Sequence, residues 1–179
     1  MKLKLLAAIL ALQVAWIIGT SAVQEVRLHR APTILLETRP VDPRDLLRGD
    51  YVILNYAIST LPPELFQPPR PELLPMGQPV YVLLEKRGEY FEAVRAAFEP
   101  LDPADGQVMM RGTLQHWNWT GTGTEVVEYG IERYYVPEGQ GNPVGKLTVE
   151  VAVAGSGQAL IKQVFLDGRP FREAMKDVQ

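Results

Sequence analysis

The sequence predicts a mainly β domain, an antiparallel β-sandwich or barrel, preceded by one N-terminal transmembrane helix. Three observations lead to this fold. A long apolar run lies between residues 5 and 23. From residue 31 onward, short apolar or alternating stretches recur between turns, which is typical of all-β domains. The chain also contains 15 glycines and 15 prolines, a composition that favours turns over long helices.

The N-terminal segment, residues 1–30, is predicted to be a membrane anchor. Lysines precede the apolar run of residues 5–23, and a helix of about 19 residues spans roughly 28 Å, close to the hydrocarbon core of a bilayer. The lysines place the N-terminus on the cytoplasmic side. A cleaved signal peptide is the alternative, with Thr20-Ser21-Ala22 as its cleavage site. Both interpretations make residues 31–179 extracytoplasmic.

The first half of the exported domain contains two predicted strands and a long excursion. Residues 33–37 are a β-branched and leucine-rich strand, and residues 40–47 follow as a compact turn. The second strand begins at Asp50 and runs to about Ser59. Residues 60–79 are proline-rich and have poor capacity for ladder hydrogen bonds, so we expect them to lie on the domain surface rather than to link two domains.

The second half is predicted to be a series of hairpins. Strands are expected over five further stretches, residues 80–86, 107–119, 125–136, 147–153 and 159–166, of which the last two form a hairpin. Residues 89–98 have apolar positions at helical spacing, but the tight Arg87-Gly88 turn before them favours a hairpin strand. The polar residues 171–178 form a tail with helical character.

Composition narrows the classes of function. With 179 residues, 46% of them apolar, the chain has room for one domain with a sizeable core. The net charge of −3 predicts no nucleic-acid partner, since such a partner requires a basic surface. The absence of cysteine excludes disulfides, thiolate metal sites and a cysteine nucleophile. With only two histidines, we expect no metal site, and no sequence feature indicates a cofactor.

The stretch from Arg48 to Tyr56 carries the most specific pattern in the chain. Gly49 and Asp50 suit a tight turn, because glycine accepts positive φ and aspartate bonds nearby amides. Strand alternation then places Asp50 and Tyr56 on one face and Tyr51 on the other. Both faces are largely apolar, which predicts a central strand and argues against one site that contains both tyrosines.

This stretch resembles the GDYXXLXY protein family, whose pattern is matched by Gly49, Asp50, Tyr51, Leu54 and Tyr56. A second stretch also resembles the family, through Tyr129, Gly130, Glu132, Arg133, Tyr134, Pro137, Glu138 and Gly139. The resemblance implies a membrane-associated, exported domain. Some relatives lie alongside or are fused to a multi-pass membrane region, and this chain differs from them in having one apolar segment.

The second stretch supplies the better candidate for a binding site. On a strand, Arg133 shares a face with Tyr129 and Tyr135, whereas Glu132 shares the opposite face with Tyr134. An arginine between tyrosines can stack on their rings and hold a carboxylate or phosphate. The alternative is an arginine that only pairs with an acid such as Asp50 or Asp42. The candidate binding residues are Asp50, Tyr51, Tyr56, Tyr129, Glu132, Arg133, Tyr134 and Glu138.

We therefore expect a membrane-anchored, extracytoplasmic accessory or binding module whose partner is another membrane or envelope protein. Nucleophile-elbow and phosphate-loop patterns are absent, which favours a protein without catalytic residues. The alternative is a carboxylate-dependent hydrolase of envelope glycans, with Asp50, Glu132 and Glu138 as its acids.

Overall fold

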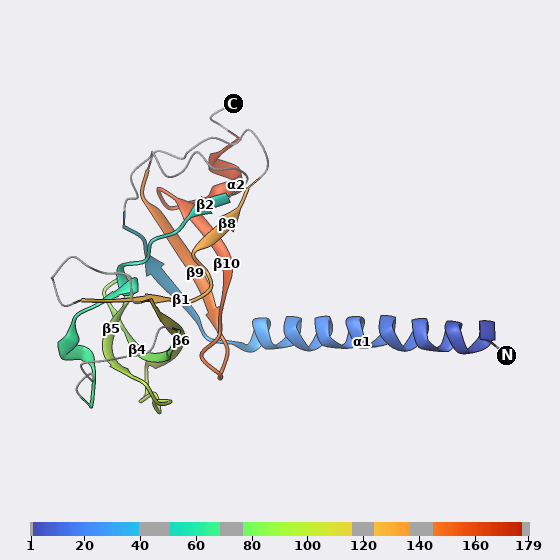
Figure 1. Cartoon of the computed structure of the whole chain (residues 1–179). Helices are drawn as coiled ribbons and strands as arrows, with labels where there is room; N and C mark the ends of the chain where they lie inside the picture. Colours follow the sequence, from blue (N-terminus) through green and yellow to red (C-terminus); the bar gives the residue numbers. More distant parts are fainter. Residues whose placement is uncertain (1, 40–50, 69–76, 116–123, 137–144, 177–179) are drawn as a thin grey trace. The chain divides into compact units, whose positions relative to one another are not determined.

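The computed structural model describes residues 2–39, 51–68, 77–115, 124–136 and 145–176. These residues form two compact units, Met1–Ala31 and Pro32–Gln179, each of which is described by itself. The second unit is mainly β, as predicted (Figure 1). Every pairing between its named strands is antiparallel, and the sheets formed by the described residues do not close on themselves.

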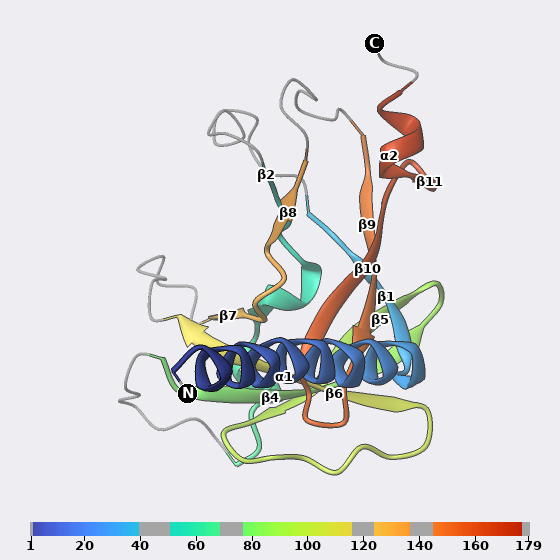
Figure 2. The ribbon, with the colours of Figure 1, turned by 90° about the vertical axis from the view of Figure 1, so that its right-hand side faces the viewer.

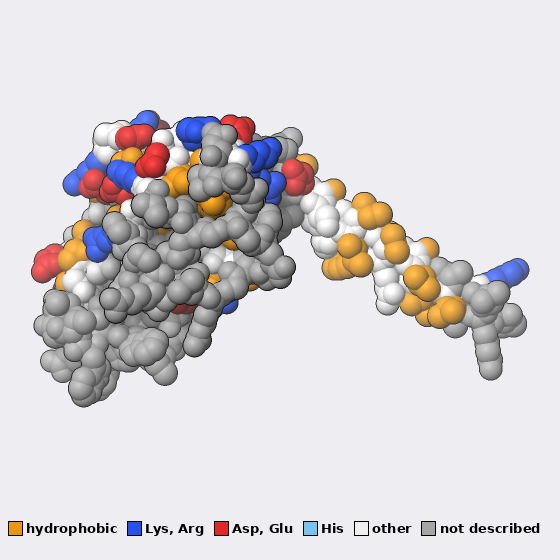
Figure 3. Space-filling view, turned by 90° about the horizontal axis from the view of Figure 1, so that it is seen from above, with side chains coloured by type: hydrophobic (Ala, Val, Ile, Leu, Met, Phe, Trp, Pro, Cys, Tyr) orange, Lys and Arg blue, Asp and Glu red, His pale blue; other side chains and the backbone are white. Residues whose placement is uncertain are grey.

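The first unit is one helix, α1 (Lys2–Arg30), which contains the whole predicted apolar segment 5–23 and extends beyond it. Large apolar side chains are exposed along its length, and they appear in orange in Figure 3. They include Leu12, Trp16, Ile17 and Ile18. Among the described residues, no helix combines the length and the apolar character needed to cross a membrane.

One sheet of the β unit has the order β1-β9-β10-β11. Its strands are β1 (Thr33–Glu37), β9 (Leu147–Val153), β10 (Ala159–Leu166) and β11 (Arg169–Pro170). The predicted hairpin of β9 and β10 is confirmed, with a bulge between Ile161 and Gln163. Its turn is closed by the amide of Ala154, which donates to the Gln158 carbonyl at 2.9 Å.

The second sheet has the order β3-β7-β6-β4-β5. Its strands are β3 (Thr60–Leu61), β7 (Glu125–Glu128), β6 (Gln107–Gln115), β4 (Pro79–Arg87) and β5 (Tyr90–Ala97). The prediction of a strand within residues 89–98 is confirmed, because β5 forms a hairpin with β4. In Figure 2, β9 and β10 run across the direction of β4 and β6.

The prediction of a long, central strand over residues 50–59 was wrong. Only β2 (Tyr51–Ile53) is a strand, and it pairs with β8 (Arg133–Tyr135) in a separate two-stranded sheet. The Leu54 amide still donates to the Glu132 carbonyl beside β8, but the next residue changes partner, because the Asn55 carbonyl accepts from the Arg39 amide. A 3-10 turn, η2 (Ala57–Ser59), ends the segment. The predicted alternation persists, since Val52, Leu54, Tyr56 and Ile58 are all buried.

The prediction of one strand over residues 125–136 was also wrong, because the chain breaks between β7 and β8. Gly130 adopts φ +80°, a conformation that L side chains rarely take and that no β-strand continues through. The side chain of Glu132 then accepts a hydrogen bond from the amide of Tyr129, which holds the turn together. One predicted strand thus becomes two strands in two different sheets.

The proline-rich segment and the C-terminal tail each insert apolar side chains into the core. The start of the proline-rich segment buries Leu61 and Phe66, and Phe66 stacks on Phe98 with ring centroids 5.4 Å apart. A 3-10 turn, η3 (Pro63–Leu65), connects Leu61 and Phe66 along the chain. The predicted helical character of the C-terminal tail is confirmed by α2 (Phe171–Ala174), whose Arg172 and Glu173 are exposed while Phe171 is buried.

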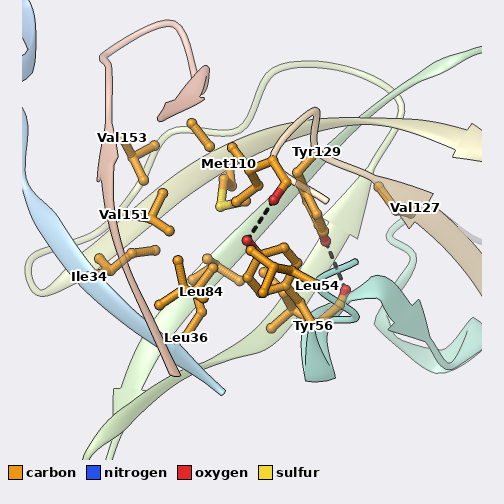
Figure 4. Close-up of a cluster of buried hydrophobic side chains, with 14 of the residues drawn as sticks. Ile34, Leu36, Leu54, Tyr56, Leu84, Met110, Val127, Tyr129, Val151 and Val153 are labelled. Atoms are coloured by element: carbon orange, nitrogen blue, oxygen red, sulfur yellow. Dashed lines mark hydrogen bonds between the residues drawn. The ribbon is translucent and has the colours of Figure 1, made fainter. Parts of the chain in front are cut away.

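A single hydrophobic core joins the sheets of the β unit. Alternate residues of β1 and β9 face it from one sheet, and alternate residues of β4 and β6 face it from the other (Figure 4). Fully burying an aliphatic side chain of this size contributes about 1.5–3 kcal/mol, which explains why the alternating sequence determines these strands.

Candidate functional site

The short ladder of β2 and β8 gathers two tyrosines and an arginine on one face. Tyr51 lies opposite Tyr135, and Ile53 lies opposite Arg133. Because residues two apart on a strand share a face, Arg133 and Tyr135 both lie beside Tyr51. The Cζ atom of Arg133 lies 5.5 Å from the centre of the Tyr51 ring, within cation–π range. Tyr51, Arg133 and Tyr135 are hereafter called the arginine–tyrosine surface.

The arginine–tyrosine surface is open to solvent. Tyr135 is 70% exposed, and it is the only large apolar side chain with high exposure among the described residues of the β unit. Its ring meets that of Tyr51 edge to face, with centroids 6.0 Å apart. Arg133 is exposed as well, and within the described residues no carboxylate lies at salt-bridge distance from it. A guanidinium held over a ring in this way retains N–H donors for an external acceptor.

The opposite face of the same ladder is structural. Val52 lies opposite Tyr134, and both point toward the core. The Tyr134 ring packs edge to face on Phe171 of α2, with centroids 5.6 Å apart. Tyr134 was a candidate binding residue, and its packing on the C-terminal helix instead indicates a role in holding the ladder to the domain.

Tyr56 and Tyr129 also lie in the core, and their hydroxyl groups serve the backbone. The Tyr56 hydroxyl donates to the carbonyl of Ile131 at 2.7 Å, and the Tyr129 hydroxyl donates to that of Ile58 at 2.9 Å. The two bonds are reciprocal, since each tyrosine reaches across to the segment that carries the other (Figure 4). The two bonds join the stretches 49–56 and 129–139, which the sequence analysis singled out, and both tyrosines are hereafter called the motif tyrosines.

Burial raises the pKa of both motif tyrosines above the ordinary value of 10.0, and the negative charge of Glu132 raises it further. Glu132 itself accepts the Tyr129 amide proton, so this carboxylate is engaged in the turn. Two of the predicted site residues, Asp50 and Glu138, lie outside the described residues, as does Asp42. The predicted pairing of Arg133 with Asp50 or Asp42 and the spacing of the three hydrolase acids therefore stay predictions.

The raised pKa values predict that stability falls steeply above pH 10. A tyrosine that stays neutral when folded but ionises when unfolded loses stability once the pH exceeds its unfolded pKa of 10.0. Well above pH 10 the loss is about 1.4 kcal/mol per pH unit for each tyrosine, or about 2.8 kcal/mol per pH unit for both. We expect urea unfolding between pH 10 and 11.5 to show this slope, and Tyr56→Phe to halve it.

The phenylalanine variant is needed because another group titrates in the same range. The pKa of Lys146 is also raised, mainly because its ammonium group donates a hydrogen bond to Glu37. Lys146 is present in both the wild type and Tyr56→Phe, so its contribution cancels in the difference between their pH slopes. Parallel curves for the wild type and Tyr56→Phe would contradict the assignment of the slope to the motif tyrosines.

The predicted arrangement of the candidate residues on strand faces is correct in part. The shared face of Arg133 and Tyr135 is confirmed, but Tyr129 is not on it, because Gly130 turns the chain before β8 begins. Tyr51 joins the site through pairing with a distant strand, for which the local sequence holds no signal. Among the described residues, no three His, Cys, Asp or Glu side chains are grouped as metal ligands.

These features define a mainly β domain in which two motif segments are joined through buried tyrosines and expose an arginine between aromatic rings. The profile of the GDYXXLXY protein family matches residues 13–164, which is most of the chain. The chain therefore belongs to the GDYXXLXY family. Comparison with curated proteins and with solved structures finds no match.

Proposed function

We propose that this chain is a non-catalytic accessory or binding module that uses the arginine–tyrosine surface to hold an acidic segment of a membrane or envelope protein. The observation that carries the proposal is the exposed Arg133 guanidinium, held 5.5 Å from the Tyr51 ring centre beside the exposed Tyr135. Arginine and tyrosine are enriched among the residues that dominate protein interfaces.

The ladder makes this surface a rigid platform, which favours binding. Tyr51 and Arg133 are both in strand positions, and the inward side of the ladder is fixed by the contact of Tyr134 with Phe171. A partner therefore meets side chains whose backbone is already ordered, which lowers the entropy cost of association. A carboxylate fits the guanidinium because charge-assisted bonds from arginine are planar and often bidentate.

The helix α1 supports the membrane part of the proposal. Its apolar side chains are exposed from Leu6 to Val26, and Lys4 lies near its N-terminus. An apolar surface of this extent marks a site of contact with lipid or with another protein. In the proposed arrangement α1 tethers the chain to a membrane, and the β unit lies on the extracytoplasmic side.

The proposal is tested by photo-crosslinking in membranes isolated from cells that express the full chain. A photoreactive amino acid at position 135 is expected to give a discrete protein adduct, and the same amino acid at the exposed position of Glu99 serves as the control. We expect Arg133→Ala to reduce the adduct about tenfold, the loss that removal of one charge-assisted hydrogen bond predicts. The adduct yield of Arg133→Lys is expected to lie between those of the wild type and Arg133→Ala, since lysine keeps the charge but not the planar donor pair.

Three outcomes would overturn the proposal. The first is recovery of the chain in the fraction that contains no membrane. The second is the absence of an adduct at position 135, and the third is an adduct that Arg133→Ala leaves unchanged. Because the tether and the binding surface are read out separately, a failure of one does not conceal the other.

A further inference from the structure

A polar groove on the β unit is lined by residues other than those of the arginine–tyrosine surface. It has a volume of about 510 Å³, within the usual range for ligand sites. Its walls come from β6, from the end of β7 and from the turn between β9 and β10. The polar side chains that line it are Arg111, Thr113, Gln115, Glu128, Ser156 and Gln158.

The sheet geometry explains why these side chains converge. Arg111, Thr113 and Gln115 alternate along β6 and share its outer face, while Gly112 and Leu114 between them are buried. Glu128 lies opposite Thr113 on β7 and therefore joins the same face. Beyond that pair, Gly130 turns the chain away from β6 at φ +80°. The departure of the chain at this point leaves the groove between β7 and the β9–β10 turn.

The β9–β10 turn closes the groove from the other side. The Gly157 carbonyl accepts a hydrogen bond from the Arg111 amide at 2.8 Å, which fixes the turn against β6. A side chain at position 157 would meet the Arg111 backbone nitrogen at 2.9 Å, so only glycine allows this approach. Ser156 and Gln158 flank Gly157, are exposed and line the groove.

The chemistry of the lining excludes three classes of ligand. An anion requires an unbalanced positive charge, but the described lining holds one cation, Arg111, and one anion, Glu128. An apolar ligand requires apolar walls, whereas the aromatic ring in the lining, Tyr129, is buried. An added peptide strand requires a run of free backbone groups, yet β7 already pairs with β6 over Thr113–Gln115 and the Arg111 amide is bonded to the Gly157 carbonyl, so residues 111–115 offer no such run on this side.

What remains is a neutral ligand rich in hydroxyl groups, and we propose that this groove binds a short neutral oligosaccharide. Amide, hydroxyl, carboxylate and guanidinium groups together offer the mixed donors and acceptors that sugar hydroxyls require. Gln115 and Glu128 are already oriented by their mutual hydrogen bond of 2.7 Å, and Arg111 lies over the Tyr81 ring at 6.0 Å. The groove is thus ordered before a ligand arrives, which favours binding.

This inference does not depend on the proposed partner of the arginine–tyrosine surface, and its test is separate. The ¹⁵N-labelled full chain, in a detergent whose head group contains no sugar, is titrated with one of three neutral trisaccharides, maltotriose, cellotriose or triacetylchitotriose, and with inorganic phosphate as the anionic comparison. We expect at least one trisaccharide to cause saturable shifts of the backbone amide signals of residues 111–115 and 156–158. Phosphate is expected to cause none.

Two variants assign the shifts to the groove. Ser156→Ala combined with Gln158→Ala removes two exposed polar groups from the lining, and we expect it to lower the affinity for the trisaccharide about tenfold. Glu99→Gln, an exposed change outside the lining, is expected to leave the affinity unchanged. Shift mapping on the unmodified chain stands even if the double variant misfolds. The proposal is overturned if no trisaccharide binds up to its solubility limit, if phosphate alone binds, or if the double variant binds the trisaccharide with the affinity of the wild type.

Discussion

Replacement of Tyr56 by alanine is expected to lower the free energy of unfolding by about 3–5 kcal/mol, the range for truncation of a buried aromatic side chain. Tyr56 is 0% exposed and lies where the first family motif enters the core. Removal of the side chain leaves a cavity between the sheets, and it also leaves the Ile131 carbonyl without the hydroxyl group that donates to it. A loss of this size is a large part of the stability of a small domain.

A phenylalanine variant separates the two causes. Tyr56→Phe keeps the ring but leaves the Ile131 carbonyl without its donor, and we expect a loss of about 1–2 kcal/mol. The matched control is Tyr135→Ala, which truncates the same residue type at an exposed site and is expected to change stability by about 0.5 kcal/mol or less. Urea unfolding of the full chain followed by circular dichroism measures all three. Equal losses for Tyr56→Ala and Tyr135→Ala would refute a structural role for the motif tyrosine.

The second large effect is expected from a single added methyl group, in Gly112→Ala. A Cβ atom at this position of β6 would contact Cγ1 of Val127 and lie 2.8 Å from the Glu128 carbonyl oxygen. The carbonyl belongs to the backbone of β7, so the clash cannot be relieved by rotating a side chain. We expect a loss of about 1–3 kcal/mol, since overpacking forces neighbouring backbone to shift.

Gly155→Ala is the matched control for this change. It lies in the turn between β9 and β10, where an added Cβ meets no atom within 4 Å, and its φ lies outside the range that requires glycine. We expect its unfolding free energy to stay within about 0.5 kcal/mol of the wild type, as for other surface substitutions. If the two alanine variants unfold at the same urea concentration, the close packing of β6 against β7 is not the reason why glycine occupies position 112.

The stretches that were predicted correctly are those where local pattern and final structure depend on the same physical cause. In β9, Val149, Val151 and Val153 alternate with more polar residues, and burial of one face requires that alternation. The hairpin of β4 and β5 follows from a short turn between two apolar runs. The alternation from Val52 to Ile58 was correct for the same reason, although most of that segment is not a strand.

The sequence therefore determines the mainly β class, most strand positions and the buried side of each motif, because these depend on the hydrophobic pattern of neighbouring residues. Only the tertiary structure decided which strands pair, and hence that Tyr51 lies beside Arg133 and that the motif tyrosines exchange hydrogen bonds. The same holds for the groove, whose walls come from three separate segments. Pairing between distant segments depends on how whole sheets pack on one core, and no local pattern of residues encodes that choice.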